Sequence, residues 1–91
     1  MLKVGFFADI RAMTGTKEIT IADAPTTLSL LMQELSARYG KTFTDFCMDD
    51  GQISRRVNIL INGIHMLHLQ KGETPLKDND DVRIFPLIGG G

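Results

Sequence analysis

The sequence has little of what several protein classes require. It contains one cysteine, Cys47, among 91 residues. One cysteine cannot form an intrachain disulfide, and it cannot supply the four thiolates of a ferredoxin-type cluster. No apolar run has the length of a membrane-spanning helix, and no signal peptide is visible. These absences favour a cytoplasmic protein that has no membrane partner.

The chain also has no large excess of positive or negative charge. The chain has 10 basic and 11 acidic residues, a formal net charge of -1, and no run of lysines or arginines. Nucleic-acid binding requires clustered cations, so we do not expect a nucleic-acid partner. A chain of this length forms one domain, residues 1–91, and buries only about 60% of its unfolded surface. We therefore expect no bound cofactor and a function that lies on the surface.

Potential metal ligands occur, but their spacing does not indicate a metal site. His65 and His68 are three residues apart in a stretch that reads as extended or turn, without a firm third ligand. The acidic run 78–81 lacks the glycine and the distal glutamate of a calcium loop. Cys47 lacks a second cysteine for redox chemistry. We expect surface histidines, a solvated acidic turn and a structural cysteine.

Four segments alternate between apolar and polar residues with the period of two that is typical of β-strands. They are residues 2–8, 18–21, 57–62 and 82–86. The first two are expected to form a hairpin, with Gly15 as the turn residue between them. Asn62-Gly63 predicts a tight turn after the third strand. Before the last strand, Asn79 can adopt the left-handed conformation.

One segment has helical spacing. Thr27 is a candidate N-cap, Gly40 sits where a helix ends, and apolar residues stand at positions 28, 31, 32, 35 and 39. Between Lys41 and Arg56 the periodicity fails, which predicts a long loop held by aromatic side chains. A hairpin, a helix and further strands, in that order, indicate an α+β fold.

The last strand runs directly into three glycines, Gly89, Gly90 and Gly91. Glycine costs conformational entropy and contributes no packing, so stability alone would not favour this ending. Fully extended, residues 88–91 reach about 13 to 14 Å, enough to thread a narrow passage in a partner. The Gly91 carboxylate is ionised at neutral pH and becomes electrophilic only after activation. We expect 88–91 to be a flexible reactive tail, the alternative being a frayed terminus.

Four stretches of the chain form a combined pattern: Val4–Arg11 with Gly15, Ile61-Asn62-Gly63, Thr74–Pro86 and the terminal Gly90-Gly91. Together they resemble the MoaD family of ubiquitin-like sulfur carriers. The resemblance spans nearly the whole chain and implies a β-grasp fold, with one main helix across a mixed sheet whose first and last strands are central and parallel. The chain departs from the family pattern at Asn79, usually glycine, and at Gly89, usually alanine or another small residue.

The resemblance also implies a function in which the chain is not itself an enzyme. An E1-like enzyme would use ATP to adenylate the Gly91 carboxylate, and a sulfur donor would then make a thiocarboxylate. As the small subunit of molybdopterin synthase, the carrier would thread Gly89, Gly90 and Gly91 into the synthase large subunit. There it would pass sulfur to a cyclic pyranopterin precursor, for either molybdenum or tungsten cofactor synthesis.

The β-grasp arrangement would also place three outward-facing apolar residues together: Phe7, Leu60 and Phe85. Strand alternation directs them away from the core, on the first, third and last strands. A contiguous apolar patch on a surface marks a binding site, so we expect partners to dock there. The alternative is that the segment 41–56 covers this face with Phe43 and Phe46.

Other functions remain open from the sequence. The same tail would suit a protein modifier that forms isopeptide bonds with lysine, and the domain could also be an inert interaction module. A thiazole-synthesis carrier is a rival sulfur carrier, although such carriers are usually shorter and lack the opening Phe6–Arg11. Replacing oxygen by sulfur at the C-terminus adds about 16 Da, whereas modification produces ladders of heavier conjugates.

Overall fold

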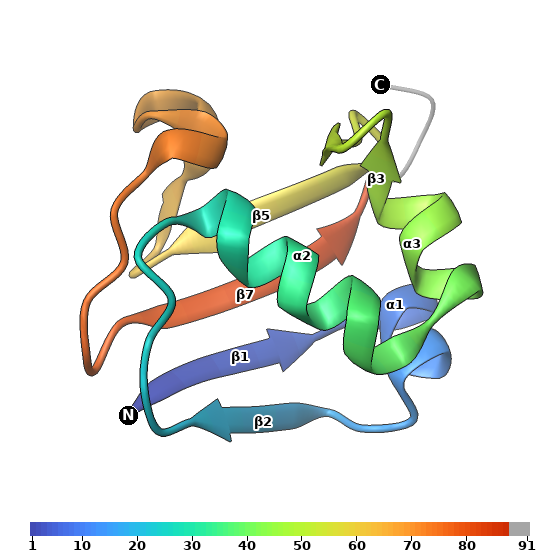
Figure 1. Ribbon diagram of the computed structural model, residues 1–91, viewed down its shortest axis with the longest axis horizontal. Coiled ribbons are helices and arrows are strands. Elements are labelled where there is room, and N and C mark those ends of the chain that lie inside the picture. Colours follow the sequence, from blue (N-terminus) through green and yellow to red (C-terminus); the bar gives the residue numbers. More distant parts are fainter. Residues whose placement is uncertain (88–91) are drawn as a thin grey trace.

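A computed structural model places a five-stranded mixed sheet behind a layer of helices (Figure 1), and it describes residues 1–87. The sheet order is β2-β1-β7-β5-β6. The strands are β1 (Leu2–Phe6), β2 (Glu18–Ile21), β5 (Val57–Ile61), β6 (Ile64–His65) and β7 (Asp81–Pro86). The central pair β1 and β7 is parallel, and the other pairs are antiparallel. This is the β-grasp arrangement, and the α+β prediction is confirmed.

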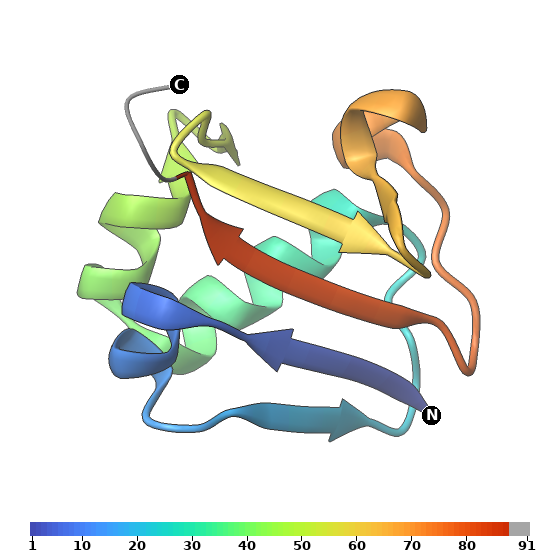
Figure 2. The same ribbon diagram turned by 180° about the vertical axis from the view of Figure 1, so that it is seen from behind.

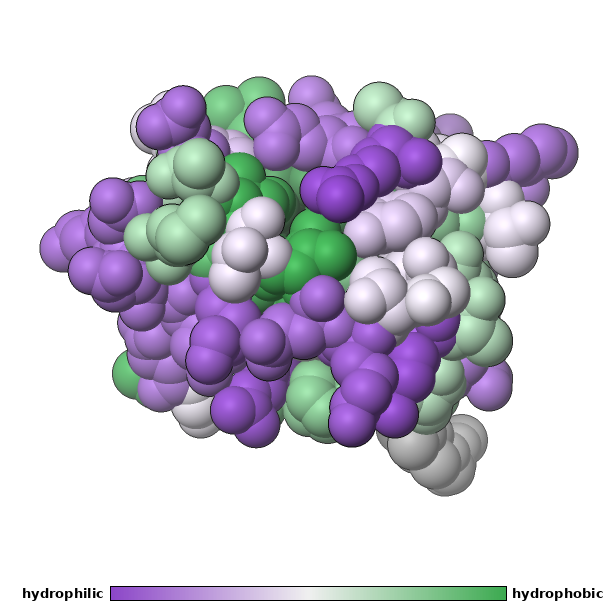
Figure 3. Space-filling model, turned by 90° about the horizontal axis from the view of Figure 1, so that it is seen from below, coloured by the Kyte–Doolittle hydropathy of each residue, from purple (hydrophilic) through white to green (hydrophobic). Residues whose placement is uncertain are grey.

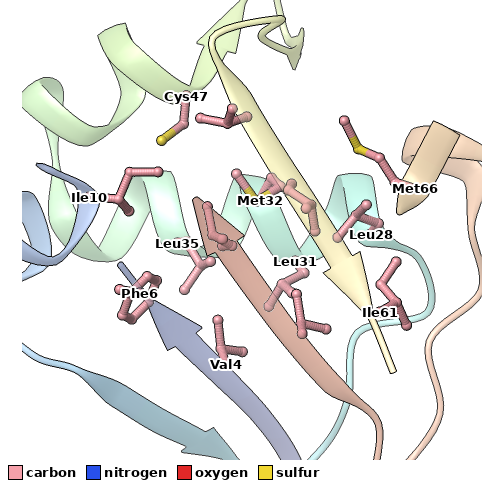
Figure 4. Close-up of a cluster of buried hydrophobic side chains, with 14 of the residues drawn as sticks. Val4, Phe6, Ile10, Leu28, Leu31, Met32, Leu35, Cys47, Ile61 and Met66 are labelled. Carbon is pink, nitrogen blue, oxygen red and sulfur yellow. The ribbon is translucent and has the colours of Figure 1, made fainter. Parts of the chain in front are cut away.

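The main helix, α2 (Leu28–Tyr39), lies across the sheet as predicted. Thr27 begins it, because the Thr27 hydroxyl oxygen accepts a hydrogen bond from the Leu30 amide at 3.3 Å. Gly40 ends it at a φ of 87°, which glycine adopts without a steric penalty. The buried side of α2 packs on the inward side chains of β1, β5 and β7 (Figure 4). Among the core residues are Val4, Phe6, Leu28, Leu31, Met32, Leu35, Ile59 and Ile84.

The connection between the first two strands is a helix, α1 (Ala8–Thr14), and not a simple hairpin turn. The predicted antiparallel pairing of β1 with β2 is confirmed, but β1 ends at Phe6 and not at Ala8. Gly15 ends α1 at a φ of 74°. Because this helix buries only Ile10, its sequence carries no repeated apolar spacing that would have revealed it.

The prediction of a long loop at 41–56 was wrong. This segment forms α3 (Lys41–Cys47) and a small hairpin of β3 (Met48–Asp49) and β4 (Gln52–Ile53). Phe43 is fully buried, and its ring meets Phe6 edge to face with centroids 6.5 Å apart. A seven-residue helix spans only two turns, too few to display a helical period.

The turn predictions are confirmed. Asn62 and Gly63 have φ values of 53° and 83° and form the tight connection between β5 and β6. Asn79 has a φ of 69° in the acidic turn before β7. Two short 3-10 helices, η1 (Met66–His68) and η2 (Lys71–Glu73), connect β6 to that turn.

Figure 3 shows the molecule from below, which is the side on which the edge strand β2 lies. A small apolar area is visible there, surrounded by hydrophilic residues. Ile19 and Ile21 of β2 are half-buried and pack against the core. Within residues 1–87, none of the helices has both the length and the apolar character needed to cross a bilayer.

Candidate functional site

The sheet has one face that no described helix covers. Seen from behind, β1, β7 and β5 lie in front of α2, and α1 stands at one end of the strands (Figure 2). This outer face carries the three apolar residues that the sequence directed outward, Phe7, Leu60 and Phe85, which we call the outer-face patch. All three are half-buried, so each keeps part of its surface available to a partner.

Phe7 and Phe85 are in direct contact in the patch. Their rings are stacked, with centroids 4.3 Å apart and an interplanar angle of 10°. Leu60 pairs with Arg83 across β5 and β7, which makes it a diagonal neighbour of Phe85. Such neighbours lie about 7 to 8 Å apart, within reach of large side chains. The tertiary structure therefore brings the three predicted residues into one neighbourhood.

The alternative, in which the segment 41–56 covers this face, is wrong. Phe43 belongs to the core, and Phe46 is half-buried against it. The Arg56 guanidinium lies over the Phe46 ring, 5.8 Å from its centroid. In Figure 1, α3 lies beside α2 on the helix side of the sheet. The patch residues belong to the opposite face, because each follows a buried core residue, Phe6, Ile59 or Ile84, along the chain. In the part of the chain that the structure describes, the patch is left uncovered.

The point where the chain leaves the sheet is held by Arg56, a residue that sequence reasoning missed. Its carbonyl oxygen accepts a hydrogen bond from the Leu87 amide at 2.7 Å, directly after β7. Its side chain donates to the carbonyl oxygens of Asp45 and Phe46, at 2.7 and 3.1 Å, and pairs with Asp49 at 3.0 Å. The start of the tail is thereby joined to the end of α3. Gly89, Gly90 and Gly91 lie outside the described residues.

His65 and the acidic turn have structural roles, and His68 is exposed on the surface as predicted. The Nε2 atom of His65 is 2.9 Å from the Asn58 side-chain oxygen, and Nδ1 accepts from the Leu67 amide at 3.1 Å, which caps η1. One carboxylate oxygen of Asp80 accepts the Lys77 amide at 2.8 Å. Across residues 1–87, no three histidine, cysteine or acidic side chains are grouped to hold a metal ion.

Cys47 is buried at the end of α3, as Figure 4 shows, which agrees with the predicted structural role. Burial raises the pKa of its thiol to about 12, and the positive charge of Arg56 offsets this only in part. Since the thiolate is the nucleophile, a raised pKa makes Cys47 unreactive near neutral pH.

We expect Cys47 to resist alkylation in the folded protein. At pH 8, a pKa of about 12 in place of 9.0 lowers the thiolate fraction on the order of 1000-fold, and burial hinders the reagent further. The measurement is the rate of iodoacetamide labelling by mass spectrometry, with the urea-unfolded chain as control. Similar rates in both states would contradict the buried position and would make Cys47 a candidate sulfur-carrying thiol.

The model of the ThiS family matches residues 4–91, which include the sheet except for the first two residues of β1, the outer-face patch and the terminal glycines. The chain belongs to the ThiS family. It is 34% identical to small archaeal modifier protein 3 of Haloferax volcanii over 91 residues, covering 99% of this chain and 98% of that protein. It is 32% identical to the molybdopterin synthase sulfur carrier subunit of Escherichia coli over 92 residues, covering all of both chains.

Solved structures of other proteins share the fold. The solution structure of small archaeal modifier protein 1 from Methanosarcina acetivorans has a TM-score of 0.83 and 30% identity, covering 99% of this chain and 95% of that one. Urm1 of Sulfolobus solfataricus has the same fold, with a TM-score of 0.72 at 21% identity, covering 93% of this chain and 99% of that one.

Membership of the ThiS family confirms the broader part of the predicted resemblance. The chain is a ubiquitin-like protein of the class that contains sulfur carriers and protein modifiers. A modifier protein and a molybdopterin synthase carrier subunit match the chain at similar identity, so the identities support both narrower assignments equally.

Proposed function

We propose that this ThiS-family protein is a sulfur carrier for molybdopterin synthesis. The observation that carries the proposal is the position of β7. This strand presents Phe85 in an uncovered apolar patch and, two residues later, leaves the sheet at Leu87 toward the terminal glycines. A partner docked on the patch is therefore already beside the start of the tail.

The proposed chemistry takes place on the Gly91 carboxylate. An oxygen of this carboxylate attacks the α-phosphorus of ATP in the site of an E1-like enzyme, pyrophosphate leaves, and an acyl adenylate forms. A hydrosulfide equivalent from a sulfur donor then attacks the acyl carbon and displaces AMP, which leaves a thiocarboxylate. The chain supplies the carboxyl group and the docking surface, and the partner supplies the nucleotide site.

The proposed destination of the sulfur is a cyclic pyranopterin precursor bound to a synthase large subunit. The end-to-end alignment with the Escherichia coli molybdopterin synthase sulfur carrier subunit supports this choice. A second candidate, protein modification through an isopeptide bond to lysine, is favoured by the 34% identity to an archaeal modifier protein. Both candidates begin with the same adenylate and differ only in the group that attacks it.

Intact-protein mass spectrometry tests the proposal. Incubated with ATP, sulfide and the E1-like enzyme of its own genome, the chain is expected to gain about 16 Da at its C-terminus. The control omits ATP, because the unactivated carboxylate is not an electrophile. Lysine-linked conjugates in the native host, without the mass gain, would support the modifier instead, and the absence of both products would refute activation of the tail.

A further inference from the structure

The outer face also contains a hollow of about 400 Å³ next to the patch. It lies over Gly5 in β1, which pairs with Glu18 of β2 and Arg83 of β7. A Cβ atom at Gly5 would meet Cε1 of Phe7 at 3.2 Å and Cγ of Arg83 at 3.9 Å. Glycine inside a strand weakens it and often marks a close approach by another molecule. The missing side chain both leaves space for the Phe7 ring and keeps the hollow open.

Arg11 of α1 lines this hollow in a fixed position. Its Nε donates a hydrogen bond to the Phe6 carbonyl oxygen at 3.1 Å. Its guanidinium lies 5.8 Å from the centroid of the Phe7 ring, which itself stacks on Phe85. A guanidinium that is already held by a hydrogen bond and an aromatic ring loses little conformational freedom when a ligand binds.

The charges around the hollow leave cations in excess. Arg83 is paired with Asp81 at 3.2 Å, so these two charges compensate each other. Arg11 and Lys17 have no carboxylate within ion-pair distance among residues 1–87, and apart from Asp81 the hollow is lined by one acidic residue, Glu18. A carboxylate is the group that a guanidinium binds through two parallel hydrogen bonds.

We propose that the hollow is a subsite of the docking surface that receives an aspartate or glutamate side chain of the activating enzyme. Arg11 binds the carboxylate through its terminal nitrogens, and Lys17 adds positive charge at the rim. The aromatic stack of Phe7 and Phe85 borders the subsite and keeps water from one side of the ion pair, which strengthens it. This inference rests on the proposed function, since it names the chemistry of a partner that docks on the same face.

The test is Arg11→Gln, which keeps a side chain of moderate length and removes the charge. With the E1-like enzyme and ATP, pyrophosphate exchange gives KM and kcat for the carrier. We expect KM to rise about 10-fold or more, as for loss of a hydrogen bond between charged groups, with kcat at saturation unchanged. Arg11→Lys keeps the charge without the fork and is expected to lie between. Arg38→Gln is the matched control, because Arg38 also lies over a ring, that of Tyr39 at 5.6 Å, but on α2.

Salt dependence separates recognition from a structural role. The KM of the wild-type carrier is expected to rise with potassium chloride more steeply than that of Arg11→Gln, because an ion pair has been lost in the variant. An unchanged KM, an equal effect of Arg38→Gln, or an unchanged salt slope would overturn the subsite and leave the proposed function standing. If Arg11→Gln does not fold, an Arg11→Lys KM equal to that of the wild type overturns it as well. If the wild-type chain is not adenylated at all, both proposals fail.

Discussion

Deleting Gly91 is expected to abolish thiocarboxylate formation while the fold remains intact. The new C-terminal carboxylate of the truncated chain stops one residue, about 3.3 to 3.6 Å, before the activating site. A misplacement of about 1 Å can cost 100-fold in rate, so we expect a loss of at least that size. The core is built from residues 2–84, so the melting temperature should not change. Intact mass after incubation with ATP, sulfide and the E1-like enzyme measures the product.

Gly90→Val provides the second arm of this experiment, because it keeps the length and the carboxylate. A β-branched side chain stiffens the backbone and widens the tail, so adenylation is expected to fall sharply if the partner's passage fits only glycine. Normal adenylation of Gly90→Val would refute the narrow passage. A full yield of thiocarboxylate from the chain without Gly91 would refute the assignment of the reactive group.

Leu60→Asp is expected to weaken docking on both the E1-like enzyme and the synthase large subunit. Burying a leucine contributes about 1.5 to 3 kcal/mol, and a carboxylate must in addition lose its hydration, so we expect at least a 10-fold rise in KM or Kd. The fold should tolerate the change, because Leu60 is half-buried and faces Arg83, which can pair with the new charge. Titration calorimetry and a thermal melt measure the two effects.

Leu30→Asp is the matched control, since Leu30 is 44% exposed on α2, on the other side of the sheet. It should leave both affinities unchanged. Phe85→Asp should also weaken docking, but it removes a stacked ring and is expected to lower the melting temperature as well. If Leu60→Asp unfolds the domain while its folded fraction still binds normally, the patch belongs to the core and the docking assignment is wrong.

Short stretches of the sequence were sufficient to predict the ends of the main helix and the positions of the turns. Thr27 and Gly40 delimit α2 because capping depends on a few neighbouring backbone groups. Asn62-Gly63 and Asn79 mark turns because few other residues adopt positive φ without strain. The period of two placed Phe7, Leu60 and Phe85 on the outer face. The resemblance, and not the periodicity, supplied the β-grasp topology, and the sulfur chemistry of the tail is likewise what the resemblance implies.

The rest depends on contacts between residues that are distant in sequence. Val4 pairs with Val82 in the parallel centre of the sheet, and no local pattern specifies such a partner. This pairing of β1 with β7 puts Phe7 against Phe85, and the antiparallel pairing of β5 with β7 places the carbonyl of Arg56 beside Leu87, where the tail begins. The short helices α1 and α3 are stabilised by packing more than by their own propensity, so their sequences did not reveal them. The hollow over Gly5 is likewise visible only when three strands and α1 are brought together, because a missing side chain becomes a binding surface only through its neighbours.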